Sequence, residues 1–216
     1  MIYLALSPIP PGLLYHLSRN LYVSLTNTAI GLPLITSRGP NFKMPESSEF
    51  TYLTDNSTPT SSEIISSVNM LWESDEFEKT SLTFAGAGDP LLQLPTLLET
   101  VKGLKETNPD KNISFRVNTN GLFSNPTSIC SQLKSNEINS ISVALNYDNE
   151  NDYNKHMLPP PPLNFETVCE FIRTFVDEEF KVTITCVDNG LCKVEKVREF
   201  AKEMGVNEFK VRSYSP

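Results

Sequence analysis

The sequence is poor in the residues that cross-link small domains or hold metal ions. It contains 4 cysteines and 2 histidines in 216 residues. The cysteines are too few and too scattered for a disulfide scaffold, and the histidines lack a partner at helical spacing. We therefore exclude a disulfide-stabilised secreted domain, expect no histidine metal site, and expect a reducing, cytoplasmic location.

Long hydrophobic runs and an excess of positive charge are also missing. No stretch approaches the roughly 20 apolar residues that span a bilayer. The apolar segment Met1–Leu6 lacks basic residues and is followed by Pro8, Pro10 and Pro11, so we expect no signal peptide. Because 18 basic and 26 acidic residues give a net charge of −8, we expect neither nucleic acid nor a membrane as a partner.

Strand-like and helix-like segments alternate along the chain, whose hydrophobic content of 39% is enough for a core. Short runs rich in β-branched and aromatic residues predict six strands: Leu21–Leu25, Thr80–Phe84, Ile113–Val117, Ser140–Leu145, Lys181–Val187 and Glu208–Ser213. Such alternation predicts an α/β fold with a parallel sheet, either open and doubly wound or closed as a barrel or partial barrel.

Helical spacing of apolar residues occurs between the predicted strands. The clearest signals are a capping box at Thr60 to Glu63, a first-turn Pro95, a cap at Asn164 and a stop at Gly205. Only Ile129 and Leu133 support a weaker helix. The long polar segment Ser37 to Thr60 is either a lid or a solvated loop.

Ligands of parallel α/β folds bind beyond the carboxyl ends of the strands, so the segments that follow the strands are informative. The first predicted strand leads into Thr26-Asn27, the second into Ala87-Gly88-Asp89-Pro90-Leu91, and the third into Asn118-Thr119-Asn120-Gly121. Each of these segments taken alone is typical of an ordinary turn. Their combination and order carry more information than any one of them.

Together these segments resemble the radical S-adenosylmethionine (radical SAM) superfamily, most closely its small TatD-associated subgroup. In that family the first strand leads into Thr-Asn-x-Cys-x3-Cys-x2-Cys, the second into a Gly-Gly-Glu type motif, and the third into Asn-Thr-Asn-Gly. The segments Ser142–Asn146 and Val211–Tyr214 are also similar to the subgroup. The resemblance implies a partial (β/α)6 TIM-type barrel with parallel strands, forming one domain over residues 1–216 with residues 1–19 as an N-terminal extension.

The sequence departs from the family where the iron–sulfur cluster would be held. Counted from Thr26-Asn27, the three cysteine positions fall on Ala29, Pro33 and Thr36. Methyl, pyrrolidine and hydroxyl groups do not replace cysteine thiolates as cluster ligands. We therefore expect no iron–sulfur cluster and no metal. The resemblance then implies the loss of both the electron donor and the iron that chelates S-adenosylmethionine.

The resemblance also implies positions for a bound nucleoside amino acid. Asp89 would accept from the amino group, although its side chain is one methylene shorter than the usual Glu. The implied cofactor-binding residues are Gly86, Gly88, Asp89, Asn118, Asn120, Ser142, Asn146 and Tyr214. From its own surroundings, Arg38 in Ser37-Arg38-Gly39-Pro40 is either an anion-binding residue or a solvated loop arginine. No catalytic residue can be named from the sequence.

The sequence therefore leaves several functions open. The leading hypothesis is a pseudoenzyme, or a protein that binds S-adenosylmethionine or a related nucleoside without radical chemistry. Alternatives are an interaction scaffold for a protein partner, and an enzyme of unrelated mechanism that uses Asp89, Asp188 and Arg38. Another alternative is an active radical SAM enzyme with an atypical cluster ligand set that includes Cys186 and Cys192. A small molecule or a protein is thus the expected partner.

Overall fold

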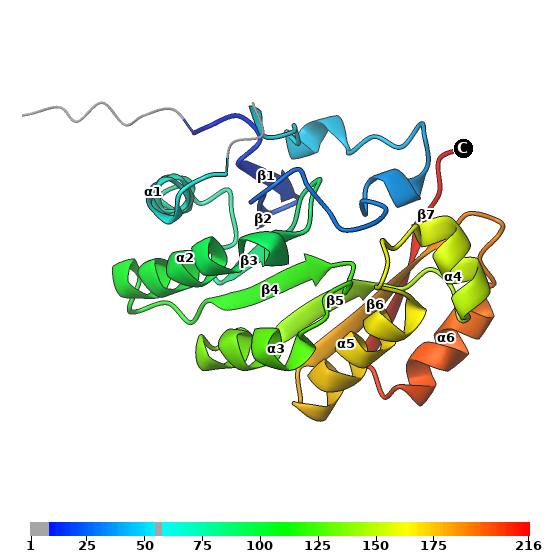
Figure 1. Cartoon of the computed structure of the whole chain (residues 1–216). Coiled ribbons are helices and arrows are strands. Elements are labelled where there is room, and N and C mark those ends of the chain that lie inside the picture. The colour runs from blue at the N-terminus through cyan, green and yellow to red at the C-terminus, as the bar shows by residue number, and fades with distance from the viewer. Residues whose placement is uncertain (1–8, 55–57) are drawn as a thin grey trace, which may run out of the picture.

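A curved, mostly parallel sheet forms the centre of the molecule. The computed structural model describes residues 9–54 and 58–216, and Figure 1 shows the sheet with helices along its outer face. The strands are β1 (Leu14–Leu17), β2 (Asn20–Val23), β3 (Ser81–Phe84), β4 (Ser114–Thr119), β5 (Ser140–Ala144), β6 (Lys181–Asp188) and β7 (Glu208–Ser213). They lie in sequence order, with β1 antiparallel to β2 and every later neighbour parallel. The prediction of an α/β partial barrel is confirmed.

Helices connect the parallel strands. They are α1 (Ser61–Trp72), α2 (Leu94–Thr107), α3 (Pro126–Ser135), α4 (Glu150–Met157), α5 (Phe165–Asp177) and α6 (Val194–Glu203), with short 3-10 helices η1 (Thr36–Arg38), η2 (Glu46–Ser48) and η4 (Pro90–Gln93). The predicted helix caps are present: Thr60 and Glu63 form a reciprocal capping box, and Asn164 caps α5. Gly205 follows α6 with φ of +77°.

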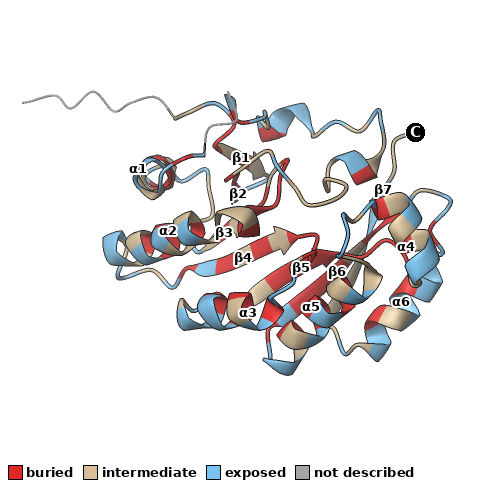
Figure 2. Ribbon diagram, in the orientation of Figure 1, coloured by how far each residue is buried: buried red, intermediate tan, exposed pale blue. Residues whose placement is uncertain are grey.

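The core lies between the sheet and its helices. Residues of neighbouring strands in register form a continuous apolar row, Phe84–Val117–Ile141–Val182, in which every side chain is fully buried. Figure 2 shows this burial along the sheet. Burying each such side chain contributes about 1.5–3 kcal/mol. Because side chains alternate along a strand, the residues between these positions face the concave side.

Two elements differ from the prediction. Strand β1 lies within the segment predicted to be an extension, and it forms a hairpin with β2 through Ser18, whose φ is +55°. Four residues at a sheet edge are too few to give a readable alternation. The polar helix α4 was also not predicted, because only Tyr153 and Met157 are buried from it.

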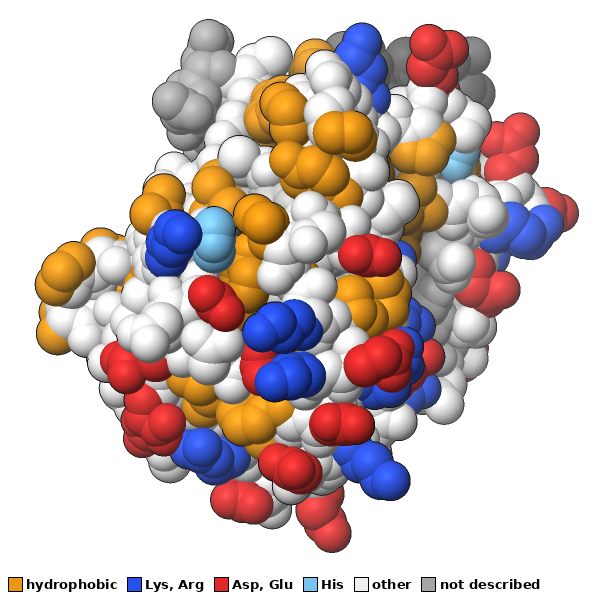
Figure 3. Space-filling model, turned by 90° about the vertical axis from the view of Figure 1, so that its right-hand side faces the viewer, with side chains coloured by type: hydrophobic (Ala, Val, Ile, Leu, Met, Phe, Trp, Pro, Cys, Tyr) orange, Lys and Arg blue, Asp and Glu red, His pale blue; other side chains and the backbone are white. Residues whose placement is uncertain are grey.

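The surface and the termini bear on the expected partners. Figure 3 shows acidic and basic side chains interspersed over the lower part of one face, so this part of the surface is of mixed charge. The expectation that the protein does not bind nucleic acid stays a prediction. The segment Met1–Leu6 lies outside the described residues, and within the described residues no helix has the length and apolar character needed to cross a membrane.

Close backbone contact joins the loop after β2 to the end of β3. The amide of Gly88 donates to the Thr26 carbonyl at 3.0 Å, and the amide of Asp89 donates to the Thr28 carbonyl at 2.8 Å. A Cβ atom at residue 88 would lie 2.3 Å from the Thr28 carbonyl oxygen, which is backbone and cannot rotate away. The glycine therefore allows the two segments to meet.

We predict that Gly88→Ala destabilises the fold by roughly 3 kcal/mol, because the added methyl group forces two backbone segments apart. Urea denaturation followed by circular dichroism measures this loss. Gly190→Ala is the control, since its Cβ would meet no atom within 4 Å and only its φ of +76° opposes the change, at about 1 kcal/mol. A loss for Gly88→Ala no larger than that of Gly190→Ala would contradict the close-contact argument.

Candidate functional site

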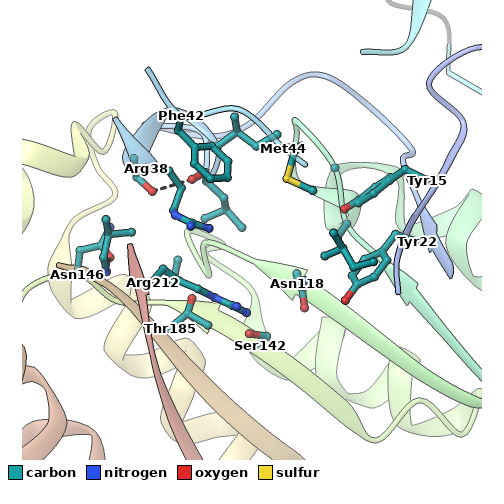
Figure 4. Close-up of a pocket in the computed structure, with 18 residues that line it drawn as sticks. Tyr15, Tyr22, Arg38, Phe42, Met44, Asn118, Ser142, Asn146, Thr185 and Arg212 are labelled. Atoms are coloured by element: carbon teal, nitrogen blue, oxygen red, sulfur yellow. Dashed lines mark hydrogen bonds between the residues drawn. The ribbon is translucent and has the colours of Figure 1, made fainter. Parts of the chain in front are cut away.

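A cavity opens on the concave side of the sheet, towards the carboxyl ends of the strands (Figure 4). Register builds its floor, because Asn118 of β4 pairs with Ser142 of β5, and Thr185 of β6 pairs with Ala144. The residues that line it are Tyr15, Leu17, Tyr22, Leu34, Ile35, Ser37, Arg38, Phe42, Met44, Ala85, Gly86, Asn118, Ser142, Ala144, Asn146, Thr185, Val187 and Arg212. None of these described lining residues is Asp or Glu.

Two arginines from distant parts of the chain share one end of the cavity. The Arg38 guanidinium donates through Nε to the Ser213 carbonyl at 2.7 Å and through Nη2 to Ser213 Oγ at 3.1 Å. It lies 4.1 Å from the centre of the Phe42 ring. Arg212 lies on β7 beside it, and Figure 4 shows both side chains reaching toward the open space. Arg38 is therefore held in a fixed position beside a second positive charge.

This pair of arginines is electrostatically uncompensated. The pKa of Arg38 is lowered, first by partial burial and second by the positive charge of Arg212. Neither side chain forms an ion pair among the described residues. By contrast, Arg116, deeper on the concave side, faces the charge of Glu208. Two like charges without a carboxylate form a suitable site for an anion.

The opposite end of the cavity is aromatic. The rings of Tyr15 and Tyr22 stack with centroids 4.9 Å apart, and Phe50 packs edge-on against Tyr15 at 5.0 Å. Figure 4 shows both tyrosines across the cavity from the arginines, with Met44 above. Burial, followed by the nearby Tyr22, raises the pKa of Tyr15, so its hydroxyl stays protonated. The cavity thus offers an apolar aromatic wall and a cationic end.

Five of the sequence-predicted residues line the cavity, and four do not. Those at the cavity are Gly86, Asn118, Ser142, Asn146 and Arg38. Those elsewhere are Gly88, Asp89, Asn120 and Tyr214. Gly88 packs against the loop after β2, and Tyr214 packs over Gly39 near the chain end. The Asn120 side chain donates through Nδ2 to the Ile30 carbonyl. Ligand contact at all nine positions stays a prediction.

Asp89 is a buried residue beside the cavity whose carboxylate accepts hydrogen bonds from the protein itself. Its side chain is 1% exposed. Oδ2 accepts from Thr119 Oγ1 at 2.6 Å and from the Asn120 amide at 2.9 Å, while Oδ1 accepts from the Leu91 amide at 3.1 Å. Burial raises the pKa of Asp89 to about 6, although these three donors oppose the shift. In this arrangement the carboxylate stabilises its own chain, and its predicted contact with a ligand amine remains untested.

The loop that carries the family's cysteine positions lies along the cavity. Ala29 and Pro33 are half-buried and Thr36 is exposed, while the intervening Leu34 and Ile35 line the cavity. None of the three side chains can supply a thiolate, and the described residues contain no group of three or more His, Cys, Asp or Glu able to hold a metal. These residues do not fit an iron–sulfur cluster. The loop presents a methyl, a pyrrolidine and a hydroxyl group where cluster ligands would be required.

The sequence did not single out several cavity residues. The missed polar and aromatic ones are Tyr15, Tyr22, Phe42, Thr185 and Arg212. Arg212 lies in a segment noted for its family resemblance, but only its alternation with the apolar residues Phe209 and Val211 indicates that it faces the concave side. The predicted lid segment contributes Arg38, Phe42 and Met44 to the cavity wall, and its closure over a ligand stays a prediction.

Comparison with known proteins identifies the fold. No protein-family model matches the sequence, and no curated protein matches it significantly. Among solved structures, the chain is similar to anSMEcpe with bound AdoMet, with a TM-score of 0.65, 17% identity and 90% of this chain covered. It is also similar to TYW1 with a lysine-pyruvate adduct bound, with a TM-score of 0.60, 12% identity and 92% covered.

A third similar structure is TsrM from Kitasatospora setae, a radical S-adenosylmethionine methyltransferase with tryptophan and aza-SAM bound. Its TM-score is 0.57, with 10% identity and 88% of this chain covered. The matched regions span 66% of the TYW1 chain, 52% of anSMEcpe and 35% of TsrM. The fold is thus the half-barrel of radical SAM enzymes. Neither the TatD-associated subgroup nor any activity is established by this likeness.

We predict that Asp89→Asn destabilises the protein by about 1–3 kcal/mol at pH 7, because an amide NH2 replaces an oxygen that faces donors. Lowering the pH to about 4.5 increases the difference in free energy of unfolding between the wild-type protein and the variant. A group with a raised folded-state pKa stabilises the fold when protonated, and this stability is lost as pH rises through about 6. Between pH 7 and pH 4.5 the difference in free energy of unfolding therefore increases by about 1–2 kcal/mol.

Urea denaturation of both proteins at the two pH values measures this difference. Asp188→Asn is the matched control, since Asp188 is exposed at the end of β6, and we expect a change within about 0.5 kcal/mol. Equal stability of Asp89→Asn and Asp188→Asn would show that the Asp89 hydrogen bonds do not support the fold.

Proposed function

We propose that the protein binds a nucleoside carrying an anionic group, such as S-adenosylmethionine or a nucleoside phosphate, in the concave cavity and without radical chemistry. The observation that carries this proposal is the pair of uncompensated arginines, Arg38 and Arg212, at one end of an aromatic-walled cavity. The proposal treats the chain as a pseudoenzyme relative to radical SAM enzymes.

The two ends of the cavity suit the two parts of such a ligand. The guanidinium groups recognise a carboxylate or a phosphate through paired, charge-assisted hydrogen bonds. The Tyr15 and Tyr22 rings, with Met44, provide the apolar surface on which a purine packs. Between them, Asn118, Ser142 and Thr185 supply hydroxyl and amide groups that suit a ribose.

The charge of the cavity refines the choice of ligand. S-adenosylmethionine carries a sulfonium and an ammonium group as well as its carboxylate. Since the described lining residues include no carboxylate and Asp89 is occupied by its own chain, the positive groups find no counter-charge. We therefore expect a nucleoside phosphate to bind more tightly than S-adenosylmethionine.

The proposed absence of radical chemistry rests on the donor atoms of the loop. An iron–sulfur cluster supplies the electron that cleaves S-adenosylmethionine in the family that the sequence resembles. Ala29, Pro33 and Thr36 offer no thiolate for it. Of the four cysteines, only Cys186 and Cys192 lie in contact, and two sulfurs do not complete a set of at least three ligands.

Calorimetric titration with S-adenosylmethionine and with adenosine monophosphate tests the binding proposal. We predict that Arg212→Gln weakens the tighter of the two by about 1.5–3 kcal/mol, roughly 10- to 100-fold, because a charge-assisted bond is lost. Arg173→Gln is the control, since Arg173 is paired with Glu166 on the surface of α5 at 2.6 Å. Its affinity should equal that of wild type.

Three results would separate the remaining functions. Binding of neither nucleoside would refute the proposal and favour the interaction scaffold. Binding that Arg212→Gln leaves unchanged would remove the arginine end from the recognition site. Tighter binding of S-adenosylmethionine than of adenosine monophosphate would contradict the charge argument. It would identify S-adenosylmethionine, the ligand of the family that the sequence resembles, as the preferred ligand.

Anaerobic reconstitution with iron and sulfide tests the second part of the proposal. We predict that the wild-type protein retains no stoichiometric iron or acid-labile sulfide and gives no cluster signal by EPR after reduction. The matched control combines Ala29→Cys, Pro33→Cys and Thr36→Cys, which restores the spacing of the family, and should retain iron. Near-stoichiometric iron and sulfide in wild type would establish an atypical ligand set and reopen radical chemistry.

A further inference from the structure

Two cysteine thiols meet at the carboxyl end of β6. Cys186 is the third-to-last residue of the strand, and Cys192 lies six residues later, just before α6. Their Sγ atoms are 2.9 Å apart and both residues are free and buried. A disulfide bond is about 2.05 Å long, so the two sulfurs are about 0.9 Å from bonding distance.

The segment between the thiols is built as a tight turn that brings them together. Asn189 Oδ1 accepts from the Cys192 amide at 2.8 Å and from the Leu191 amide at 3.0 Å. Gly190 adopts φ of +76° at the tip. These contacts position Cys192 over the end of the strand before any covalent bond exists, so little chain entropy is lost when a bond forms.

We propose that Cys186 and Cys192 are a reversible oxidation site that closes to an intrachain disulfide by exchange with a small disulfide such as oxidised glutathione. The proposal is independent of the nucleoside-binding function. It uses the two thiols in contact rather than Cys130 and Cys169, which lie in the helices α3 and α5.

Cys192 is the better placed of the two to react first. The hydrogen bond from the Cys186 thiol lowers the pKa of Cys192, and the same bond, followed by burial, raises the pKa of Cys186. Cys192 also lies in a surface turn whose neighbour Leu191 is 63% exposed. A small local opening of this turn would admit the oxidant.

The exchange balances in two steps. The Cys192 thiolate attacks one sulfur of oxidised glutathione, forms a mixed disulfide and releases a glutathione thiolate, which takes up the proton that Cys192 lost. The Cys186 sulfur then attacks Cys192 Sγ and displaces the second glutathione, which takes up the proton of the Cys186 thiol. Two electrons pass from the pair to the small disulfide, and two molecules of reduced glutathione result.

The pair lies directly behind the cavity, which gives oxidation a route to the ligand site. Asn146, a lining residue, accepts from the Val187 amide at 2.8 Å, and its carbonyl lies 3.9 Å from Cys186 Sγ. The Asn189 side-chain amide donates through Nδ2 to the Tyr147 hydroxyl at 3.2 Å. A covalent link across this turn would fix the segment that carries Val187 and so stiffen one wall of the cavity.

The sequence makes the site simple to observe. Trypsin cleaves after Lys181 and Lys193, and the peptide 182–193 between them contains both Cys186 and Cys192 but neither of the other cysteines. The native protein is exposed to oxidised glutathione, and the protein thiols that remain free are then alkylated under denaturing conditions. The tryptic digest is analysed by mass spectrometry. We expect peptide 182–193 to lose the mass of two hydrogen atoms and to escape blocking. Two of the four thiols remain titratable, and reduction restores all four.

Two variants test the assigned order of reaction. Cys186→Ser should accumulate a glutathione adduct on Cys192, because no second thiol resolves it. Cys192→Ser should leave Cys186 reduced, because it is fully buried. Cys130 and Cys169 serve as internal controls, since burial raises the pKa of Cys130 to about 11 and of Cys169 to about 12.

The outcomes that overturn the proposal are equally definite. Peptide 182–193 of wild type at its reduced mass after exposure would refute it. So would a stable glutathione adduct on wild-type Cys192 without ring closure. Oxidation that consumes Cys130 or Cys169 as readily as the pair would show that the exposure had unfolded the chain and that the contact in the native fold does not direct the reaction.

Discussion

The buried carboxylate of Asp89 holds together the strand ends on which the cavity is built. It accepts hydrogen bonds from Thr119 and Asn120 at the end of β4 and from Leu91 in η4. The backbone amide of Asp89 donates to Thr28 in the loop after β2. The side chain and the backbone of Asp89 therefore fix three segments that are distant in sequence around one residue. Since the cost of burying a charge is large unless it is paired with donors, these contacts depend on one another.

A second constraint ties the loop over the cavity to the end of the sheet. Arg38 donates twice to Ser213, and its carbonyl accepts from the Ser215 amide at 2.8 Å. The contact that places Arg38 at the positive end of the cavity thus also ties the loop after β2 to the end of β7. The like charge of Arg212 beside Arg38 is an electrostatic cost that a bound anion would relieve.

Much of the fold could be read from the sequence because its patterns are local. The strand runs, the Thr60 capping box and the Asn164 cap each depend on residues within a few positions of one another. Strand β1 and helix α4 could not be read, since each has few buried side chains and depends on its neighbours for stability. Pairing across the sheet, rather than local propensity, makes β1 a strand.

The candidate site was less accessible to sequence reasoning. Positions directly after the strands were found, as with Gly86 and Asn146, because the topology of parallel sheets places ligands there. The role of Asp89 could not be decided from the sequence. A carboxylate that binds a ligand and one that holds loops together by hydrogen bonds both occur directly after a strand. Tyr15 was missed because it lies on the unpredicted strand β1. Tyr22 lies on a predicted strand, but the stacked pair depends on the register of β1 with β2.

Residues other than cysteine at positions 29, 33 and 36 are compatible with the fold because the fold does not depend on thiols there. Its stability comes from apolar rows on the helix side of the sheet, such as Phe84–Val117–Ile141–Val182, and from the hydrogen bonds of Asp89. Residues 29, 33 and 36 take no part in either. A chain only 10–17% identical to three radical SAM enzymes can therefore share their half-barrel without a thiol at these three loop positions. Because the likeness extends to the fold alone, the charge and the walls of the cavity, and not its ancestry, carry the functional assignment.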